Sequence, residues 1–310
     1  MDFRANGKLM ISGEYLVLSG ARALAIPVKL GQTLTITESE SSQNTINWTT
    51  SVKEKEWLRL SFSGAALTPH TPHGLTDFKQ RAANFVHNLL LKAKELNPDF
   101  LKEEASYSIN SEVEFDMSWG LGSSSSLIAN VARWAQVDPF RLLFGVSKGS
   151  GYDVACALHD SPLLYRFLGQ ENKPEVELIT FNPVFASQLF FVYSGKKQDS
   201  AEQIRKFNPA GISKTDIENI TQLSEQMAAS SNLDTFMQLM QTHEDIIGSH
   251  IGMIPVQQRF FSDFPGSIKS LGAWGGDFLM AAAAIAPVDI ISYFRKKGHN
   301  VIFPFGEMIR

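Results

Sequence analysis

The first part of the chain alternates apolar and polar positions in a way that predicts β-strands. The alternation runs through Lys8–Ser12 and Gln32–Thr37, with the apolar segment Ala23–Val28 between them. Two further β-rich segments, Thr45–Thr50 and Trp57–Phe62, lie on either side of a charged turn. We therefore expect a hairpin at the edge of a sheet in this part of the chain.

Apolar positions with helical spacing follow. Asp77, with Gln80 three residues later, opens a pattern of apolar residues that recur every three or four positions, and Asn97 and Pro98 end it. Further helices are predicted over 126–136, 153–160, 213–230, 232–248 and 287–298, and further strands over 107–117, 163–167, 176–181, 188–193, 277–286 and 300–305. These elements lack the strict strand and helix alternation of a doubly wound sheet.

The length and a change of character near 182–187 predict two domains. At roughly 150 residues per domain, 310 residues are enough for about two, each with its own core. We expect an α+β fold with an N-terminal domain over residues 1–184 and a C-terminal domain over residues 185–310.

Composition excludes several classes of protein. A net charge of −4 argues against nucleic-acid binding, which needs concentrated positive charge. The longest apolar run, Phe278–Ala286, is far shorter than the roughly 20 residues of a membrane span. Charged residues near the N-terminus argue against a secretory signal. The single cysteine, Cys156, suits a reducing cytoplasm, so we expect a cytoplasmic protein that binds neither nucleic acid nor membrane.

The segment Trp119–Ser126 has the strongest pattern for ligand binding. Gly120 and Gly122 permit backbone conformations in which successive N–H groups point into one concavity, and a predicted helix begins directly afterwards. A phosphate would be held there, and the serine hydroxyls could donate to it or hold Mg²⁺. The alternative is a flexible turn that caps the helix. The motifs of P-loop proteins and of protein kinases do not occur in the sequence.

Three further segments could carry chemistry. Asp153 follows a tight glycine turn at the start of a predicted helix, which suits a general base and equally a helix-capping carboxylate. The segment Leu271–Ala281 places three glycines before a buried strand, where the backbone can approach a ligand closely. Lys8 and Glu14 lie at the ends of the first strand and its turn, where lone charges are usually solvated.

Together these segments resemble, in the right order, the galactokinase, homoserine kinase, mevalonate kinase and phosphomevalonate kinase superfamily, the GHMP kinases. The resemblance covers nearly the whole chain. It rests on the loop GLGSSSS, preceded by GEYLVL and ALAIPV and followed by GSGYD and GAWGGD. Tyr15, in place of the histidine usual in mevalonate kinases, and Asp277, in GGDF, resemble the phosphomevalonate kinase branch.

The resemblance implies a fold, a reaction and a set of site residues. The fold would be an N-terminal domain with a left-handed βαβ crossover and a ferredoxin-like C-terminal domain. The reaction would be phosphoryl transfer from ATP, with Mg²⁺, to a small and anionic acceptor, in a chain compatible with a homodimer. Lys8 and Asp153 would be catalytic. The ATP phosphates would contact Gly120, Leu121, Gly122, Ser123, Ser124, Ser125 and Ser126, with Ser124 on the metal, and the acceptor would contact Glu14, Tyr15, Ser150, Gly151, Gly272, Gly275 and Gly276.

Some residues depart from the family pattern and leave alternatives open. Leu142 stands where many mevalonate kinases carry a magnesium-binding glutamate, so the second metal ligand is not identified. A protein of this fold could act on another acceptor, act as a decarboxylase or have lost activity. GVSKG also matches a nucleophile elbow with Ser147, although its preceding strand is poorly supported. We expect His243 and His250 to be partly exposed helix residues, with His243 and Glu244 as candidates for the acceptor pocket.

Overall fold

The computed structural model describes residues 1–41, 43–64, 66–70, 74–171, 173–196, 207, 211–272, 274 and 276–310. Its contacts divide the chain into two compact units. Unit 1 consists of Met1–Gly7, Leu30–Met117 and Gly122–Lys148, and unit 2 of Lys8–Lys29, Ser118–Leu121 and Gly149–Arg310. The expected domain boundary at residue 184 stays a prediction, as does the handedness of the crossover.

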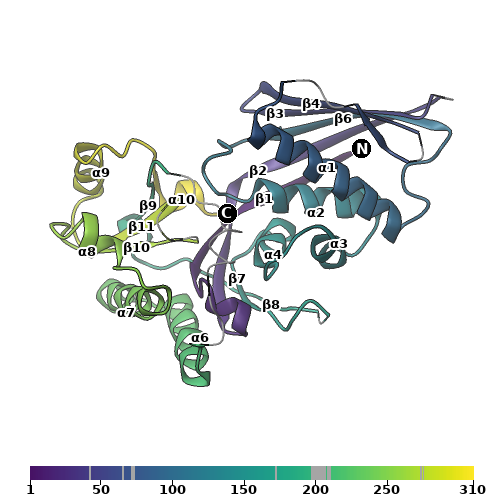
Figure 1. Cartoon of the computed structure of the whole chain (residues 1–310). Coiled ribbons are helices and arrows are strands. Elements are labelled where there is room, and N and C mark those ends of the chain that lie inside the picture. Colours follow the sequence, from purple (N-terminus) through teal and green to yellow (C-terminus); the bar gives the residue numbers. More distant parts are fainter. Residues whose placement is uncertain are drawn as a thin grey trace. The chain divides into compact units, whose positions relative to one another are not determined.

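The elements form a mixed α+β structure with a large sheet and a smaller antiparallel sheet, which confirms the expected fold class (Figure 1). The strands are β1 (Asp2–Ser12), β2 (Arg22–Glu40), β3 (Thr45–Val52), β4 (Lys55–Ser63), β5 (Thr68–His70), β6 (Ala105–Val113), β7 (Leu163–Arg166), β8 (Glu175–Leu178), β9 (Leu189–Tyr193), β10 (Ser267–Ser270), β11 (Phe278–Ala282) and β12 (Ile302–Pro304). The α-helices are α1 (Asp77–Leu96), α2 (Ser123–Ala135), α3 (Pro139–Val146), α4 (Tyr152–Leu158), α6 (Lys214–Ala229), α7 (Leu233–Ile251), α8 (Val256–Phe260), α9 (Pro287–Lys296) and α10 (Phe305–Met308).

Unit 1 contains the hairpin and the first long helix that the sequence predicts. Its strands pair in the order β5–β4–β3–β6–β2, antiparallel except for the parallel pair β3 and β6. Helix α1 begins after Thr76, whose hydroxyl accepts from the Lys79 N–H, and its residues Val86, Leu89 and Leu90 are buried. Helices α1, α2 and α3 contact one another. The apolar spacing read from the sequence is therefore the buried face of α1.

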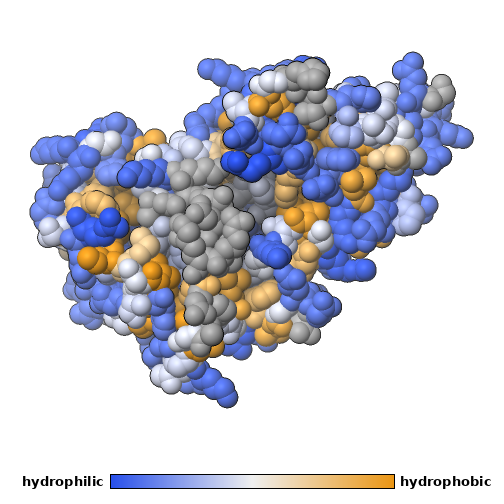
Figure 2. Space-filling model, viewed as in Figure 1, coloured by the Kyte–Doolittle hydropathy of each residue, from blue (hydrophilic) through white to orange (hydrophobic). Residues whose placement is uncertain are grey.

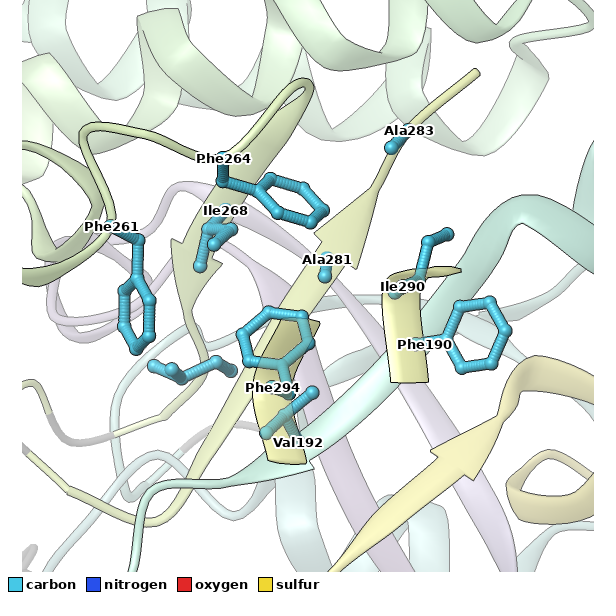
Figure 3. Close-up of a cluster of buried hydrophobic side chains, with 10 residues drawn as sticks. Phe190, Val192, Phe261, Phe264, Ile268, Ala281, Ala283, Ile290 and Phe294 are labelled. Carbon is cyan, nitrogen blue, oxygen red and sulfur yellow. The ribbon is translucent and has the colours of Figure 1, made fainter. Parts of the chain in front are cut away.

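Unit 2 contains the smaller sheet, in which the strands pair in the order β10–β11–β9–β12. One face of this sheet carries a buried cluster in which Phe264, Ile268 and Ala281 pack with Phe294 of α9 (Figure 3). Strand β10, which the sequence analysis did not predict, pairs with β11 and contacts α7 and α8. Its four residues are all buried and include a lysine, so it lacks the alternation that marks a half-exposed strand.

Polar residues predominate on the face of the molecule drawn in Figure 2, with smaller apolar areas between them. Among the described residues, no helix combines the length and the apolar character needed to cross a membrane.

Candidate active site

Lys8 lies on β1 directly beside the predicted phosphate loop. Its backbone N–H donates to the Leu121 carbonyl at 2.9 Å, and its Nζ lies 5.5 Å from the centre of the Tyr152 ring. Burial on its own lowers the pKa of Lys8, but Tyr152 and the carboxylates of Asp153 and Asp277 outweigh it and raise that pKa above its ordinary value. Lys8 is therefore a fixed positive charge at neutral pH.

Asp153 lies in the first turn of α4, as the glycine turn before it predicts. Gly151 caps the helix with a φ of +86°, which glycine adopts readily. The Tyr165 hydroxyl donates to the Ser150 carbonyl and fixes the turn from β7. The neighbouring Tyr152 hydrogen-bonds the Lys8 side chain, and burial, with a contribution from Asp153, raises its pKa to about 12. Tyr152 is therefore a neutral hydroxyl beside Lys8, and the sequence analysis did not single it out.

Asp277 completes this cluster from the loop that precedes β11. Its φ is +54°, and its backbone is held by hydrogen bonds to Ser194 and Lys196. A Cβ placed on Gly120 would lie 2.5 Å from the Asp277 carboxyl carbon, so the carboxylate packs directly on the glycine-rich loop. Gly120 also has a φ of +68°. Both the backbone conformation and this close approach therefore require glycine at position 120. We call Lys8, Tyr152, Asp153 and Asp277 the Lys8 cluster.

The N-terminus of α2, in unit 1, carries the serines of the loop. Gly122 caps the helix at a φ of +90°, and the first N–H groups of an α-helix have no acceptor within it, which favours an anion there. Ser124 is exposed, whereas Ser125 and Ser126 are buried. The Ser126 hydroxyl donates to Gln32 Oε1 at 2.7 Å, so its proton is engaged within unit 1. Ser124 is therefore the better placed hydroxyl for a phosphate or a metal ion.

Glu14 is buried in a second charged cluster, in contrast to the solvated position usual for a lone charge at a strand end. It is 2 % exposed, and its two carboxylate oxygens lie 2.8 Å from Lys269 Nζ and 3.1 Å from His243 Nε2. Burial raises its pKa, but the Lys269 ammonium outweighs this effect and lowers the pKa of Glu14 below the ordinary value. Glu14 Oε1 is thus paired with Lys269, whereas the buried Oε2 has no hydrogen-bond partner among the described residues.

His243 and Glu244 are buried on α7 beside Glu14, so the expectation that His243 is partly exposed is wrong. His243 Nε2 accepts a hydrogen bond from the Gly13 N–H at 2.9 Å, and burial lowers its pKa, so the ring is neutral. Glu244 Oε1 accepts from the Ser270 N–H at 3.1 Å, and burial raises its pKa to about 8. We call Glu14, His243, Glu244 and Lys269 the Glu14 cluster.

Tyr15 and the late glycine-rich loop contact each other. The Trp274 N–H donates to the Tyr15 hydroxyl at 3.3 Å, and the Tyr15 ring packs against Phe207. Tyr15 has a φ of +61°, a rare conformation for a residue with a side chain. Gly272 is partly exposed with a φ of +69°, and Gly276 is buried. Gly275, which the resemblance also implied, lies outside the described residues.

The remaining sequence candidates have no place in these clusters. Ser147 follows helix α3, not the strand that a nucleophile elbow requires, so the hydrolase interpretation is wrong. Leu142 is fully buried in α3 and offers no metal ligand. His250 is partly exposed, as expected, and lies 3.5 Å from Asp216. Across the described parts of the chain, no group of three or more His, Cys, Asp or Glu side chains could hold a metal ion.

The comparisons with known proteins give the fold. Neither a scan against protein-family models nor a search of curated protein sequences finds a match. Among solved structures, the Methanococcus jannaschii mevalonate kinase matches with a TM-score of 0.70 at 17% identity, over 98% of this chain and 96% of that one. The Streptococcus pneumoniae phosphomevalonate kinase, in complex with phosphomevalonate and AMPPNP, matches with a TM-score of 0.71 at 14% identity, over 98% and 99%.

A sugar kinase matches as well. The Lactococcus lactis galactokinase, complexed with galactose, has a TM-score of 0.62 at 12% identity, over 95% of this chain and 87% of that one. Identities this low establish the fold and leave the acceptor open. The matches nevertheless span almost the whole chain and include three of the enzymes from which the superfamily takes its initials. The chain therefore has the two-domain fold of the GHMP kinases.

Proposed function

We propose that the protein is an ATP-dependent kinase that transfers the γ-phosphoryl group to a hydroxyl of a small mevalonate-pathway acceptor, either phosphomevalonate or mevalonate. The observation that carries this proposal is the Lys8 cluster. A fixed ammonium faces two carboxylates, and its own backbone is hydrogen-bonded to the glycine-rich loop. Such a cluster combines a cation for a transferring phosphoryl group with a base for a hydroxyl.

In this proposal Asp153 serves the acceptor. The acceptor hydroxyl gives its proton to the Asp153 carboxylate while its oxygen forms a bond to the γ-phosphorus. The bond from that phosphorus to the β–γ bridging oxygen breaks, and ADP leaves with the electron pair. Lys8 stabilises the negative charge on the transferring group, and Tyr152 holds the ammonium by its hydrogen bond. The rate then depends on positioning and charge more than on covalent chemistry.

The donor groups of the chain fit Mg²⁺. This ion prefers oxygen ligands and is usually held by one or two carboxylates together with substrate phosphates. In unit 2, Asp277 on the loop before β11 supplies such an oxygen. When bound with the nucleotide, the ion would neutralise charge on the β- and γ-phosphates.

Two similarities support the choice of acceptor. The sequence around Lys8, Asp153 and Asp277 resembles the phosphomevalonate kinase branch. The fold matches the phosphomevalonate kinase in complex with phosphomevalonate, at a TM-score of 0.71, and the L. major mevalonate kinase in complex with R-mevalonate, at a TM-score of 0.65. Galactose and homoserine are the acceptors against which this choice is tested.

The test is an assay of ADP release that depends on ATP and Mg²⁺, run with mevalonate, phosphomevalonate, galactose and homoserine. We expect turnover with one of the first two, lost in Asp153→Asn while ATP binding is retained. Asp234→Asn, which removes an exposed carboxylate from α7, is the matched control and should keep wild-type turnover. Turnover with galactose or homoserine alone would contradict the acceptor, and absence of ATP binding would contradict the kinase.

A further inference from the structure

The first residues of the glycine-rich segment pack on the smaller sheet. Residues Ser118–Leu121 belong to unit 2, together with β9, β11 and β12. The Trp119 ring packs edge to face against Phe303, at 5.5 Å between ring centres, and against Phe278, at 6.2 Å. It also lies 6.4 Å from the ring of Tyr193. These three partners come from three neighbouring strands of the sheet, and we call them the aromatic platform.

The strand register places the three rings of the aromatic platform on one face of the sheet. Tyr193 lies directly opposite Phe278, and Phe303 lies opposite Phe191, which is two residues before Tyr193. Side chains alternate along a strand, so Phe190 points to the other face, into the buried cluster of Figure 3. Backbone pairing thus sets the aromatic platform independently of Trp119.

Hydrogen bonds hold the backbone of the same segment at both ends. The Tyr193 hydroxyl donates to the Ser118 carbonyl at 3.1 Å, and the Lys8 N–H donates to the Leu121 carbonyl at 2.9 Å. Between these two bonds lies Gly120, which has a φ of +68° and no side chain to restrict its backbone. The two bonds and the packed indole therefore restrict a backbone that glycine by itself leaves flexible.

We propose that Trp119 and Tyr193 are positioning residues, which hold the backbone around Gly120 in the conformation that receives the nucleotide phosphates. This inference rests on the proposed kinase function. Backbone N–H groups bind a phosphate more tightly when they are already oriented, because ordering a flexible loop upon binding costs affinity. Neither side chain needs to touch the nucleotide, since both act through the loop.

The experiment measures binding of AMPPNP with Mg²⁺ by calorimetry, and thermal unfolding of the same samples. Tyr193→Phe keeps the ring and removes only the hydroxyl, so we expect a normally folded protein whose Kd for AMPPNP rises about threefold. In Trp119→Leu we expect the Kd to rise about tenfold, and Trp119→Phe should restore most of the affinity because it returns an aromatic ring to the platform.

Tyr293→Phe is the matched control. It removes a hydroxyl that donates to Asp263, beside the cluster on the other face of the sheet, and should keep the wild-type Kd. A merely structural contact would lower the melting temperature and the number of binding sites per chain, and would leave the Kd of the folded molecules unchanged. The Kd therefore separates positioning from stability. If Trp119→Leu does not fold, the comparison of Tyr193→Phe with Tyr293→Phe decides by itself.

Different results separate this inference from the proposed function. If the wild type binds AMPPNP and the Kd is unchanged in Tyr193→Phe, the positioning role is wrong while the kinase stands. A rise in Kd in Trp119→Leu alone would mean that Trp119 acts by its own contacts, which also contradicts the shared role. If the wild type does not bind AMPPNP, the kinase is wrong and this inference is wrong with it.

Discussion

The Lys8 cluster and the Glu14 cluster are both groups of charged side chains in unit 2, but the Glu14 cluster is buried whereas Lys8 and Asp153 are partly exposed. In the Glu14 cluster, Lys269 pairs with Glu14 at 2.8 Å, His243 is neutral and Glu244 is protonated at neutral pH. In the Lys8 cluster, one ammonium faces two carboxylates. In the Glu14 cluster the one ammonium is paired with one carboxylate inside the protein, whereas the Lys8 cluster lies at the glycine-rich loop. We expect the first to serve stability and the second to serve chemistry.

The largest effect should come from Asp153→Asn. Removing a general base typically costs about 10²–10⁴ in rate. We expect kcat to fall by roughly 10³ while the melting temperature changes little, because Asp153 is partly exposed and its replacement by asparagine keeps the shape of the side chain. Steady-state kinetics and thermal unfolding on the same samples check this. A variant that loses stability in proportion to activity would erase the distinction between the two clusters.

The next effect should come from Lys269→Met, which leaves Glu14 buried without its partner. Breaking a buried ion pair in this way costs about 3–5 kcal/mol of unfolding free energy. Urea unfolding measures it, and kcat per folded molecule should change little. The double variant Lys269→Met with Glu14→Gln should recover most of the loss, because no uncompensated charge remains. A double variant as unstable as the single one would show that the pair acts through packing alone.

A smaller effect should appear in the pH dependence of stability. The Glu244 pKa is raised to about 8 in the folded protein from an ordinary value of 4.5, so between these values the folded state holds a proton that the unfolded state has released. Stability therefore falls as pH rises through this range. His243 has a lowered pKa and contributes only below its ordinary value of 6.5, so the window from 6.5 to 8 isolates Glu244.

Across that window we expect the unfolding free energy to fall by about 1–2 kcal/mol in the wild type. Glu244→Gln should remove most of this fall, because glutamine keeps the shape and does not ionise. Urea unfolding at several pH values, with Asp245→Asn on the exposed side of α7 as control, measures the difference. An unchanged slope in Glu244→Gln would assign the pH dependence to other groups.

The smallest effect should come from Tyr152→Phe. The hydroxyl hydrogen-bonds the charged Lys8 side chain, and a hydrogen bond to a charged group is worth about 1.5–3 kcal/mol. Part of that bond is replaced by water, so we expect kcat to fall about tenfold with KM for ATP nearly unchanged. A change confined to KM would place Tyr152 in nucleotide binding instead of the positioning of Lys8.

The sequence predicted local elements well and buried charge poorly. The spacing of Val86, Leu89 and Leu90 was enough to predict the buried face of α1, since helical periodicity is a local property. Strand β10, which contains Lys269, was not predicted, because all four of its residues are buried and apolar and polar positions do not alternate along it. His243 was expected near the surface, since nothing in its own segment shows that Gly13 and Glu14 would cover it.

The sequence by itself determined the glycine turns, because glycine is the residue that adopts left-handed backbone conformations most readily. The turns at Gly120 and Gly151, and Asp153 directly after the second, could therefore be predicted. It also determined the order of motifs that resembles the GHMP kinases. Only the tertiary structure decided which charges meet. Glu14 and Lys269 are 255 residues apart, and no local pattern encodes that the turn after β1 meets β10. The contact between the Asp277 carboxylate and Gly120 is also long-range, so the sequence did not show that Asp277 lies on the glycine-rich loop.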